Sequence, residues 1–186
     1  MPAAARLRRT LRWTMLAAIA LYAALIGLRV LYPIDYVSLV RHWSIERGLN
    51  PALVAAMVRA ESRFHADAVS PKGAIGLMQI MPETGIWIAE EIGIDGFTVG
   101  SLVDPETSLR LGTWYFATLV ARFEDLRPAL QAYNAGPTRA EEWLDNSEAV
   151  FAETKAYVDR VLQSVRVYRM YLALPWLIRA IPQLPL

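Results

Sequence analysis

The chain has 186 residues, no cysteine, and 19 basic against 18 acidic side chains. That length fits one domain with an appendage, and the lack of cysteine excludes disulfides, a thiolate nucleophile and cysteine-based metal sites. Residues 1–32 carry five arginines and no acid, whereas residues 33–186 carry 14 basic and 18 acidic side chains, a balance of −4. A nucleic-acid-binding domain is basic where it binds, so no nucleic-acid partner is expected.

An apolar segment near the N-terminus predicts a transmembrane anchor over residues 13–32. Residues 13–28 contain no charged side chain, and the apolar run continues past Arg29 to Tyr32. A spanning helix needs about 20 apolar residues, so the segment is long enough if Arg29 reaches the membrane interface. The basic segment over residues 1–12 precedes it, and the positive-inside rule places that segment in the cytoplasm.

Two other interpretations of this segment stay open. A cleaved signal peptide needs small residues at its cleavage site, and the stretch Gly27-Leu28-Arg29-Val30-Leu31 is a poor one. A buried helix of a soluble domain usually has a polar face, which residues 13–28 nearly lack. We favour an uncleaved anchor, which places the rest of the chain outside the cytoplasm.

Residues 33–174 show helical periodicity and almost no alternation of period two, which predicts one all-α domain of about seven short helices. Several start signals pair an N-cap with a first-turn proline, as in Asn50-Pro51 and Asp104-Pro105. The tail over residues 175–186 is rich in proline and apolar residues and is expected to be irregular. We expect helices at 35–47, 51–62, 82–92, from Pro105 onward, from Pro128 to Gly136, at 138–145 and at 153–171.

Glu61 is the first candidate catalytic residue. It continues the apolar helix face of Val54, Met57 and Val58, so its carboxyl is expected to lose water. Desolvation raises a carboxyl pKa, which is how a glutamic acid stays protonated near neutral pH and donates a proton. On the helix pattern alone, a solvated glutamate at the helix end is the more ordinary interpretation. The motifs that follow favour the catalytic one.

Three segments follow the Glu61-Ser62 pair in a recognisable order. The first, residues 70–82, reads Ser-Pro-Lys-Gly-Ala-Ile-Gly-Leu-Met-Gln-Ile-Met-Pro, with two glycines suited to tight turns. Residues 132–136 read Ala-Tyr-Asn-Ala-Gly, and residues 153–158 read Glu-Thr-Lys-Ala-Tyr-Val. Together these blocks resemble the soluble-type lytic transglycosylases of the goose-type-lysozyme-like group, and the resemblance spans roughly residues 36–170.

This resemblance implies a lysozyme-like fold and roles for individual residues. Glu61 matches the single catalytic acid/base of the family, and Ser62 and Tyr157 match supporting positions. Ser108 stands where the family usually has asparagine, and it can still make a hydrogen bond at a helix start. The residues that match substrate-binding positions in the sugar cleft are Ser70, Gln79, Met81, Tyr133, Asn134 and Glu153.

The resemblance also implies a reaction, the cleavage of the β-1,4 bond between N-acetylmuramic acid and N-acetylglucosamine in peptidoglycan. Glu61 would protonate the glycosidic oxygen and then accept the proton of the C6 hydroxyl, whose attack on C1 forms a 1,6-anhydro product. Most glycosidases need two carboxylates, and the nearest acids, Asp67 and Glu83, resemble loop and helix-start residues. The alternatives are a lysozyme-like hydrolase with the same acid and a catalytically idle peptidoglycan-binding scaffold.

With the N-terminal segment, the resemblance implies a single-pass protein of the bacterial inner membrane whose catalytic domain lies in the periplasm. Its expected partners are peptidoglycan glycan strands, the inner membrane through residues 13–32, and envelope or secretion-machine proteins. The only histidines, His42 and His65, lack zinc-type spacing, and no metal or other cofactor is expected. Trp87, Trp114 and Trp143 could stack on sugars, although tryptophans at helical spacing are more often core.

Overall fold

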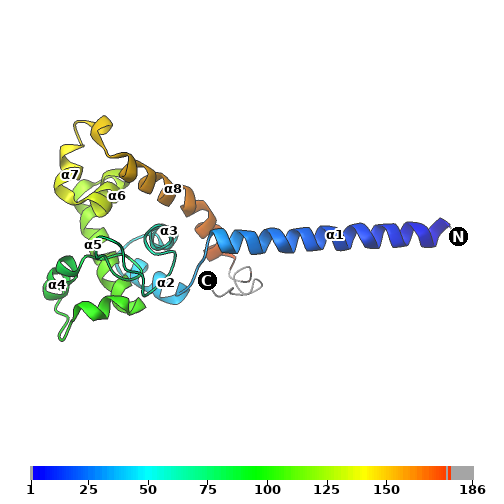
Figure 1. Ribbon diagram of the computed structural model, residues 1–186, viewed down its shortest axis with the longest axis horizontal. Coiled ribbons are helices and arrows are strands. Elements are labelled where there is room, and N and C mark those ends of the chain that lie inside the picture. The colour runs from blue at the N-terminus through cyan, green and yellow to red at the C-terminus, as the bar shows by residue number, and fades with distance from the viewer. Residues whose placement is uncertain (1, 175, 177–186) are drawn as a thin grey trace.

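The computed structural model describes residues 2–174 and 176 (Figure 1). Within these residues the chain forms eight α-helices and two short 3₁₀ helices, and the only β structure is a pair of isolated bridges. The elements in order are α1 (Pro2–Leu31), α2 (Val37–Glu46), α3 (Pro51–Glu61), α4 (Pro82–Glu91), η1 (Val99–Val103), α5 (Pro105–Phe123), α6 (Leu126–Ala135), α7 (Pro137–Glu142), η2 (Ser147–Ala149) and α8 (Ala152–Ala173).

The prediction of an all-α domain with about seven helices after an N-terminal helix is confirmed for the described residues. One predicted start was wrong: α6 begins at Leu126 and not at Pro128. The Asp125 side chain accepts a hydrogen bond of 2.9 Å from the Arg127 amide and caps the helix, so the proline falls in the first turn, where its missing N–H is tolerated. The prediction for the 175–186 tail falls, apart from residue 176, outside the described residues.

Helix α3 lies at the centre of the domain. Every residue from Ala52 to Val58 is buried, as expected for a helix that is apolar on all sides. Its most extensive partner is α8, on which Tyr157, Val158 and Val161 are buried. Glu61 lies where these two helices meet, because α3 ends at Glu61 and α8 begins beside it.

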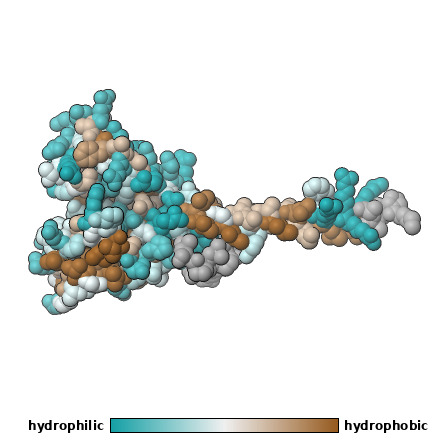
Figure 2. Space-filling view, in the orientation of Figure 1, coloured by the Kyte–Doolittle hydropathy of each residue, from teal (hydrophilic) through white to brown (hydrophobic). Residues whose placement is uncertain are grey.

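Helix α1 extends from the domain as a single long rod (Figure 1). By length and composition, the segment Arg6–Leu31 is long and apolar enough to cross a membrane, and an 18-residue stretch within it has a mean hydropathy of 2.0. The described apolar side chains of α1 are exposed over most of its length, and only those near its end, Leu25, Ile26 and Leu28, pack against the domain core. Figure 2 shows the hydrophobic surface running along the rod between a hydrophilic N-terminal portion and the domain. Such exposure contradicts the interpretation of this segment as a core helix.

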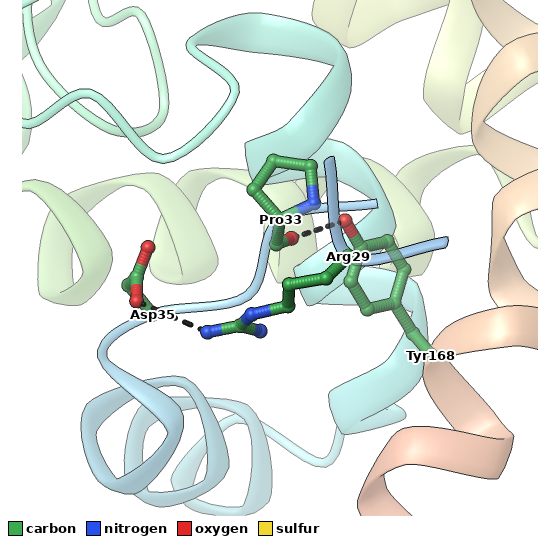
Figure 3. A network of polar contacts seen from close by, with 4 residues as sticks. All are labelled: Arg29, Pro33, Asp35 and Tyr168. Atoms are coloured by element: carbon green, nitrogen blue, oxygen red, sulfur yellow. Dashed lines mark hydrogen bonds and ion pairs between the residues drawn. The ribbon is translucent and has the colours of Figure 1, made fainter. Parts of the chain in front are cut away.

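The junction between α1 and the domain is fixed by polar contacts (Figure 3). The Tyr168 hydroxyl of α8 donates a hydrogen bond of 2.7 Å to the Pro33 carbonyl. Arg29, near the end of α1, is only 6% exposed and pairs with Asp35 at 3.5 Å. These contacts tie α8 and the segment leading into α2 to the last turn of α1.

Arg59 of α3, and Arg63 just beyond the end of that helix, also contact the last turn of α1. Arg59 Nε donates a hydrogen bond of 2.9 Å to the Leu31 carbonyl, and its guanidinium lies 4.3 Å from the centre of the Tyr32 ring. Arg63 donates to the Val30 carbonyl at 3.1 Å. Carbonyls in the last turn of a helix have no partner within the helix, so these arginines cap α1.

Candidate active site

A pocket of about 380 Å³ lies where the end of α3, the loop over residues 62–81, the end of α6 and the start of α8 meet. All seven residues predicted to act on or bind substrate line it, although they come from segments more than 90 positions apart in the sequence. Three further lining residues, Pro71, Lys72 and Ala74, belong to the first motif but were not predicted as site residues. The full lining is Glu61, Ser70, Pro71, Lys72, Ala74, Gln79, Met81, Tyr133, Asn134 and Glu153.

Glu61 is the last residue of α3 and is partly buried. Desolvation by burial raises the pKa of its carboxyl from 4.5 to about 7, while the Tyr157 hydroxyl and the Arg160 charge oppose this shift to a smaller extent. Val54, Met57 and Val58, whose helix face Glu61 continues, are all buried, and burial disfavours the charged form of a carboxyl. Glu61 is therefore partly protonated at neutral pH and able to donate a proton.

Tyr157 lies behind Glu61 on the first turns of α8 and is buried. Its hydroxyl interacts with the Glu61 carboxyl but forms no hydrogen bond of normal geometry to any described atom. Burial, followed by the Glu61 charge, raises the pKa of Tyr157 well above its usual value. Tyr157 is therefore neutral, and its hydroxyl keeps a proton that it can donate in a hydrogen bond to the Glu61 carboxylate.

Ser62 does not line the pocket. It is buried, and its hydroxyl lies 2.9 Å from the Leu77 carbonyl, to which it donates. The same oxygen accepts the Phe64 amide at 3.2 Å. Ser62 thus joins the 62–81 loop to the end of α3 from outside the pocket.

Gln79 has a left-handed backbone, with φ of 48°, which is uncommon for a residue other than glycine. Its side-chain nitrogen donates to the Ala68 carbonyl at 3.0 Å and to the Gly76 carbonyl at 2.9 Å. Gly76 has φ of +83°, and a Cβ atom there would lie 2.0 Å from the Leu102 carbonyl oxygen. Only glycine fits at position 76, so Gly76 allows the backbone course that brings Gln79 into the pocket.

Helix α5 packs directly against the loop over residues 62–81. The Ser108 hydroxyl accepts a hydrogen bond of 3.1 Å from the Met78 amide, so the expected helix-start bond was wrong. Asp104 already caps that helix by accepting the Thr107 amide at 2.8 Å, which leaves the Ser108 side chain to the loop. A Cβ atom on Gly112 would lie 2.5 Å from the Met78 sulfur, so this glycine allows the loop to pack directly on α5.

Tyr133 and Asn134 close the pocket from α6. The Tyr133 hydroxyl donates to the Met78 carbonyl at 2.8 Å, and burial, followed by the Glu61 charge, raises its pKa well above the usual value. The Asn134 side-chain oxygen accepts from the Thr154 hydroxyl at 3.0 Å, which joins α6 to α8. Both residues are therefore held in place by contacts to a neighbouring segment.

Ser70 and Glu153 occupy more open positions. The Ser70 hydroxyl accepts the Ala74 amide at 3.0 Å and shapes the turn that carries Lys72. Glu153 lies exposed in the first turn of α8, where a carboxylate also offsets the helix dipole. The pocket therefore contains two carboxyl groups in different surroundings, one desolvated and one exposed. Among the described residues, no group of three histidine, cysteine or acidic side chains could hold a metal ion.

A desolvated glutamic acid in an open polar pocket of an all-α domain is typical of lysozyme-like, glycan-cleaving domains. The family described as the transglycosylase SLT domain matches residues 38–155, and the chain belongs to this family. The predicted family and the lysozyme-like fold are thereby confirmed.

Curated relatives share this region. The chain is 35% identical over 154 residues to the soluble lytic murein transglycosylase of Escherichia coli strain K12, covering 76% of this chain and 24% of the relative. It is 31% identical over 124 residues to the transglycosylase of Enterobacteria phage PRD1, covering 67% of this chain and 40% of that protein. A membrane-bound lytic murein transglycosylase C of Actinobacillus pleuropneumoniae is 38% identical over 87 residues, covering 46% of this chain and 24% of the relative.

Solved structures agree with the sequence relatives. The lytic transglycosylase Slt of Pseudomonas aeruginosa, solved as an inactive glutamate-to-glutamine mutant, superposes with a TM-score of 0.73 at 32% identity, over 78% of this chain and 26% of that chain. The 70-kDa soluble lytic transglycosylase of Escherichia coli gives 0.72 at 34% identity, with the same coverage. The chain spans about a quarter of the length of these relatives.

Proposed function

We propose that this protein is a peptidoglycan lytic transglycosylase that cleaves the β-1,4 bond between N-acetylmuramic acid and N-acetylglucosamine and releases a 1,6-anhydro product. The observation that carries the proposal is Glu61, whose pKa of about 7 suits one group to act first as acid and then as base. The relatives of the matched region are named lytic murein transglycosylases, and the proposal extends that activity to this chain.

In the proposed mechanism, protonated Glu61 donates its proton to the glycosidic oxygen as the bond to C1 breaks. The resulting carboxylate accepts the proton of the C6 hydroxyl of the same sugar, and that oxygen bonds to C1. The first proton leaves on the released sugar and the C6 hydroxyl proton re-protonates Glu61, so no water is consumed and no enzyme nucleophile is needed. Neutral Tyr157 and the charge of Arg160 favour the carboxylate during the middle of this cycle.

The other pocket residues have binding roles in this proposal. Gln79, Tyr133 and Asn134 present fixed polar groups or ring edges to the sugars, and exposed Met81 offers an apolar wall. Glu153, exposed in the first turn of α8, binds hydroxyl or amide groups. It is not needed as a nucleophile, because the C6 hydroxyl of the substrate attacks C1. Ser70 and the neighbouring Lys72 border the pocket on the loop side.

We further propose that α1 anchors the domain in the inner membrane and that the domain faces the periplasm. The length and hydropathy of Arg6–Leu31 support a spanning helix, and the arginines before it favour a cytoplasmic N-terminus. Since α1 is capped directly by Arg59 and Arg63, the domain would stand close to the bilayer, within reach of envelope or secretion-machine proteins. A reporter fused after Leu186 that is active only in the cytoplasm would contradict this topology.

The proposal and its alternatives differ in their products. Full-length protein in detergent is incubated with purified sacculi, and the released muropeptides are weighed by mass spectrometry. Products that end in 1,6-anhydro-N-acetylmuramic acid support the lytic transglycosylase. Products heavier by one water support a hydrolase, and binding to sacculi without release supports a scaffold.

A further inference from the structure

A row of aromatic rings leads from the pocket onto the surface of α4. Tyr133 lines the pocket, and its ring lies 5.7 Å from that of Tyr115, between ring centres. The Tyr115 ring lies 6.1 Å from that of Trp87, which in turn lies 5.7 Å from that of Trp114. Helix α5 thus supplies two adjacent rings that support the Trp87 side chain.

Trp87 stays exposed despite these contacts. It is 46% exposed, whereas Trp143 is 6% exposed and fulfils the core role that tryptophans usually have. Helix α4 also begins just after Met81, a pocket-lining residue that is 43% exposed. Trp87 lies six positions after Met81, which is about 9 Å along the helix axis. One helix therefore carries both a wall of the pocket and an exposed indole beyond it.

We propose that Trp87 is a sugar-stacking subsite, which binds a pyranose ring of the glycan strand beyond the part held in the pocket. The inference rests on the proposed function and adds to it a determinant of strand length. A pyranose ring presents a face of C–H groups that packs against an aromatic face, while its hydroxyl groups need polar partners at the rim. The indole provides a large, rigid apolar surface with a polar N–H group, and Trp114 and Tyr115 hold it in position before binding.

The neighbours of Trp87 fit a saccharide better than an apolar protein partner. Residues three or four positions away share its side of the helix, and three of them are exposed acids, Glu83, Glu90 and Glu91. Carboxylates accept hydrogen bonds from sugar hydroxyls, whereas charged residues are depleted at the centres of protein interfaces. They also disfavour contact with an anionic lipid surface. Continuity with the pocket through Tyr115 and Tyr133 identifies the strand in the pocket as the occupant.

The test compares oligosaccharides of two lengths. Full-length protein carrying Glu61→Gln, in detergent, is titrated calorimetrically with chitotriose, which samples the pocket, and with chitohexaose, which is long enough to reach Trp87. A second substitution is then added: Trp87→Leu, which still packs on the α5 rings but lacks a flat face, or Trp87→Tyr, which keeps one. Ile86→Ala, at an equally exposed neighbouring site, is the matched control.

We expect Trp87→Leu to weaken chitohexaose binding about three- to tenfold and to leave chitotriose binding unchanged, with Trp87→Tyr and Ile86→Ala close to the parent. Unchanged chitohexaose binding in Trp87→Leu would overturn the subsite. So would equal weakening of both oligosaccharides, because Trp87 would then act on the pocket through the fold. Release of anhydro products from sacculi by the wild-type chain is measured in parallel, so that loss of the subsite is distinguished from failure of the proposed function.

Discussion

Arg59, two residues before Glu61 on α3, donates a hydrogen bond of 2.9 Å from Nε to the Leu31 carbonyl at the end of α1. The helix that carries the candidate catalytic acid is therefore in direct contact with the candidate membrane anchor. The Arg59 guanidinium also donates a hydrogen bond of 3.1 Å to the Ser164 hydroxyl of α8. One side chain thus joins the anchor to both helices that form the surroundings of Glu61.

We expect Arg59→Ala to lower the free energy of unfolding by about 1–2 kcal/mol, because it removes a helix cap, a cation–π contact and a hydrogen bond. Thermal unfolding of the full-length protein in detergent measures the loss. Arg169→Ala, at an exposed position of α8, is the control and should have little effect. Equal shifts for the two variants would mean that Arg59 does not couple α1 to α3.

The raised pKa of Glu61 predicts a pH-dependent gain in stability for Glu61→Gln. A raised carboxyl pKa means that the folded state binds the proton more tightly than the unfolded chain, so the wild type loses stability as pH rises from 4.5 to about 7. The variant lacks this loss. At pH 8 it should therefore be more stable than the wild type by about 1–3 kcal/mol, and at pH 4 the difference should be much smaller.

Thermal melting at both pH values measures this gain, and Glu153→Gln provides a control at an exposed pocket carboxylate. Its stability relative to the wild type should change little between pH 4 and pH 8. A gain for Glu61→Gln that is the same at both pH values would show that the Glu61 carboxyl is solvated.

Tyr157→Phe should shift the pH dependence of activity. The Tyr157 hydroxyl lowers the pKa of Glu61, so its removal should raise that pKa and move the alkaline limb of kcat/KM to higher pH. Tyr171→Phe is a matched control, because Tyr171 is also buried on α8 and its hydroxyl has no hydrogen-bond partner among the described residues. If both variants give the wild-type profile, the Tyr157 hydroxyl does not act on Glu61.

Gly112→Ala should disturb the pocket from outside it. The new methyl group would lie 2.5 Å from the Met78 sulfur and 2.7 Å from the Met78 Cβ, which rotation of the side chain cannot relieve, so the loop that carries Gln79 must move away from α5. We expect a stability loss of about 1–3 kcal/mol and a fall in activity of at least tenfold. Gly100→Ala, whose methyl group would meet only an ordinary contact at 3.7 Å, should retain activity; an equally active Gly112→Ala would show that the loop tolerates displacement.

Local pattern was sufficient to predict much of this fold. The helix starts at Pro51 and Pro105 and the buried face that leads to Glu61 follow from capping residues and apolar spacing. The motifs also identified the residues that the fold gathers into one pocket. Their catalytic and binding roles stay predictions, which the variants described above test.

The remaining features depend on contacts between distant segments. The bond from Ser108 to the Met78 amide spans 30 positions, and the bond from Arg59 to Leu31 spans 28, so no local periodicity contains them. Trp87 shows the same limit. Its spacing suits a core residue, and only the packing of α4 on α5 shows that the ring remains exposed beside the pocket.

The most direct test of the central claim compares the wild type with Glu61→Gln on purified sacculi, with 1,6-anhydro muropeptides quantified over time by mass spectrometry. A group that serves as both acid and base contributes at least about 10²–10⁴-fold to the rate. We therefore expect anhydro products from the wild type and a rate at least a hundredfold lower from the variant, whose melting temperature is no lower than that of the wild type. A folded Glu61→Gln protein that keeps more than a tenth of the wild-type rate would contradict the account.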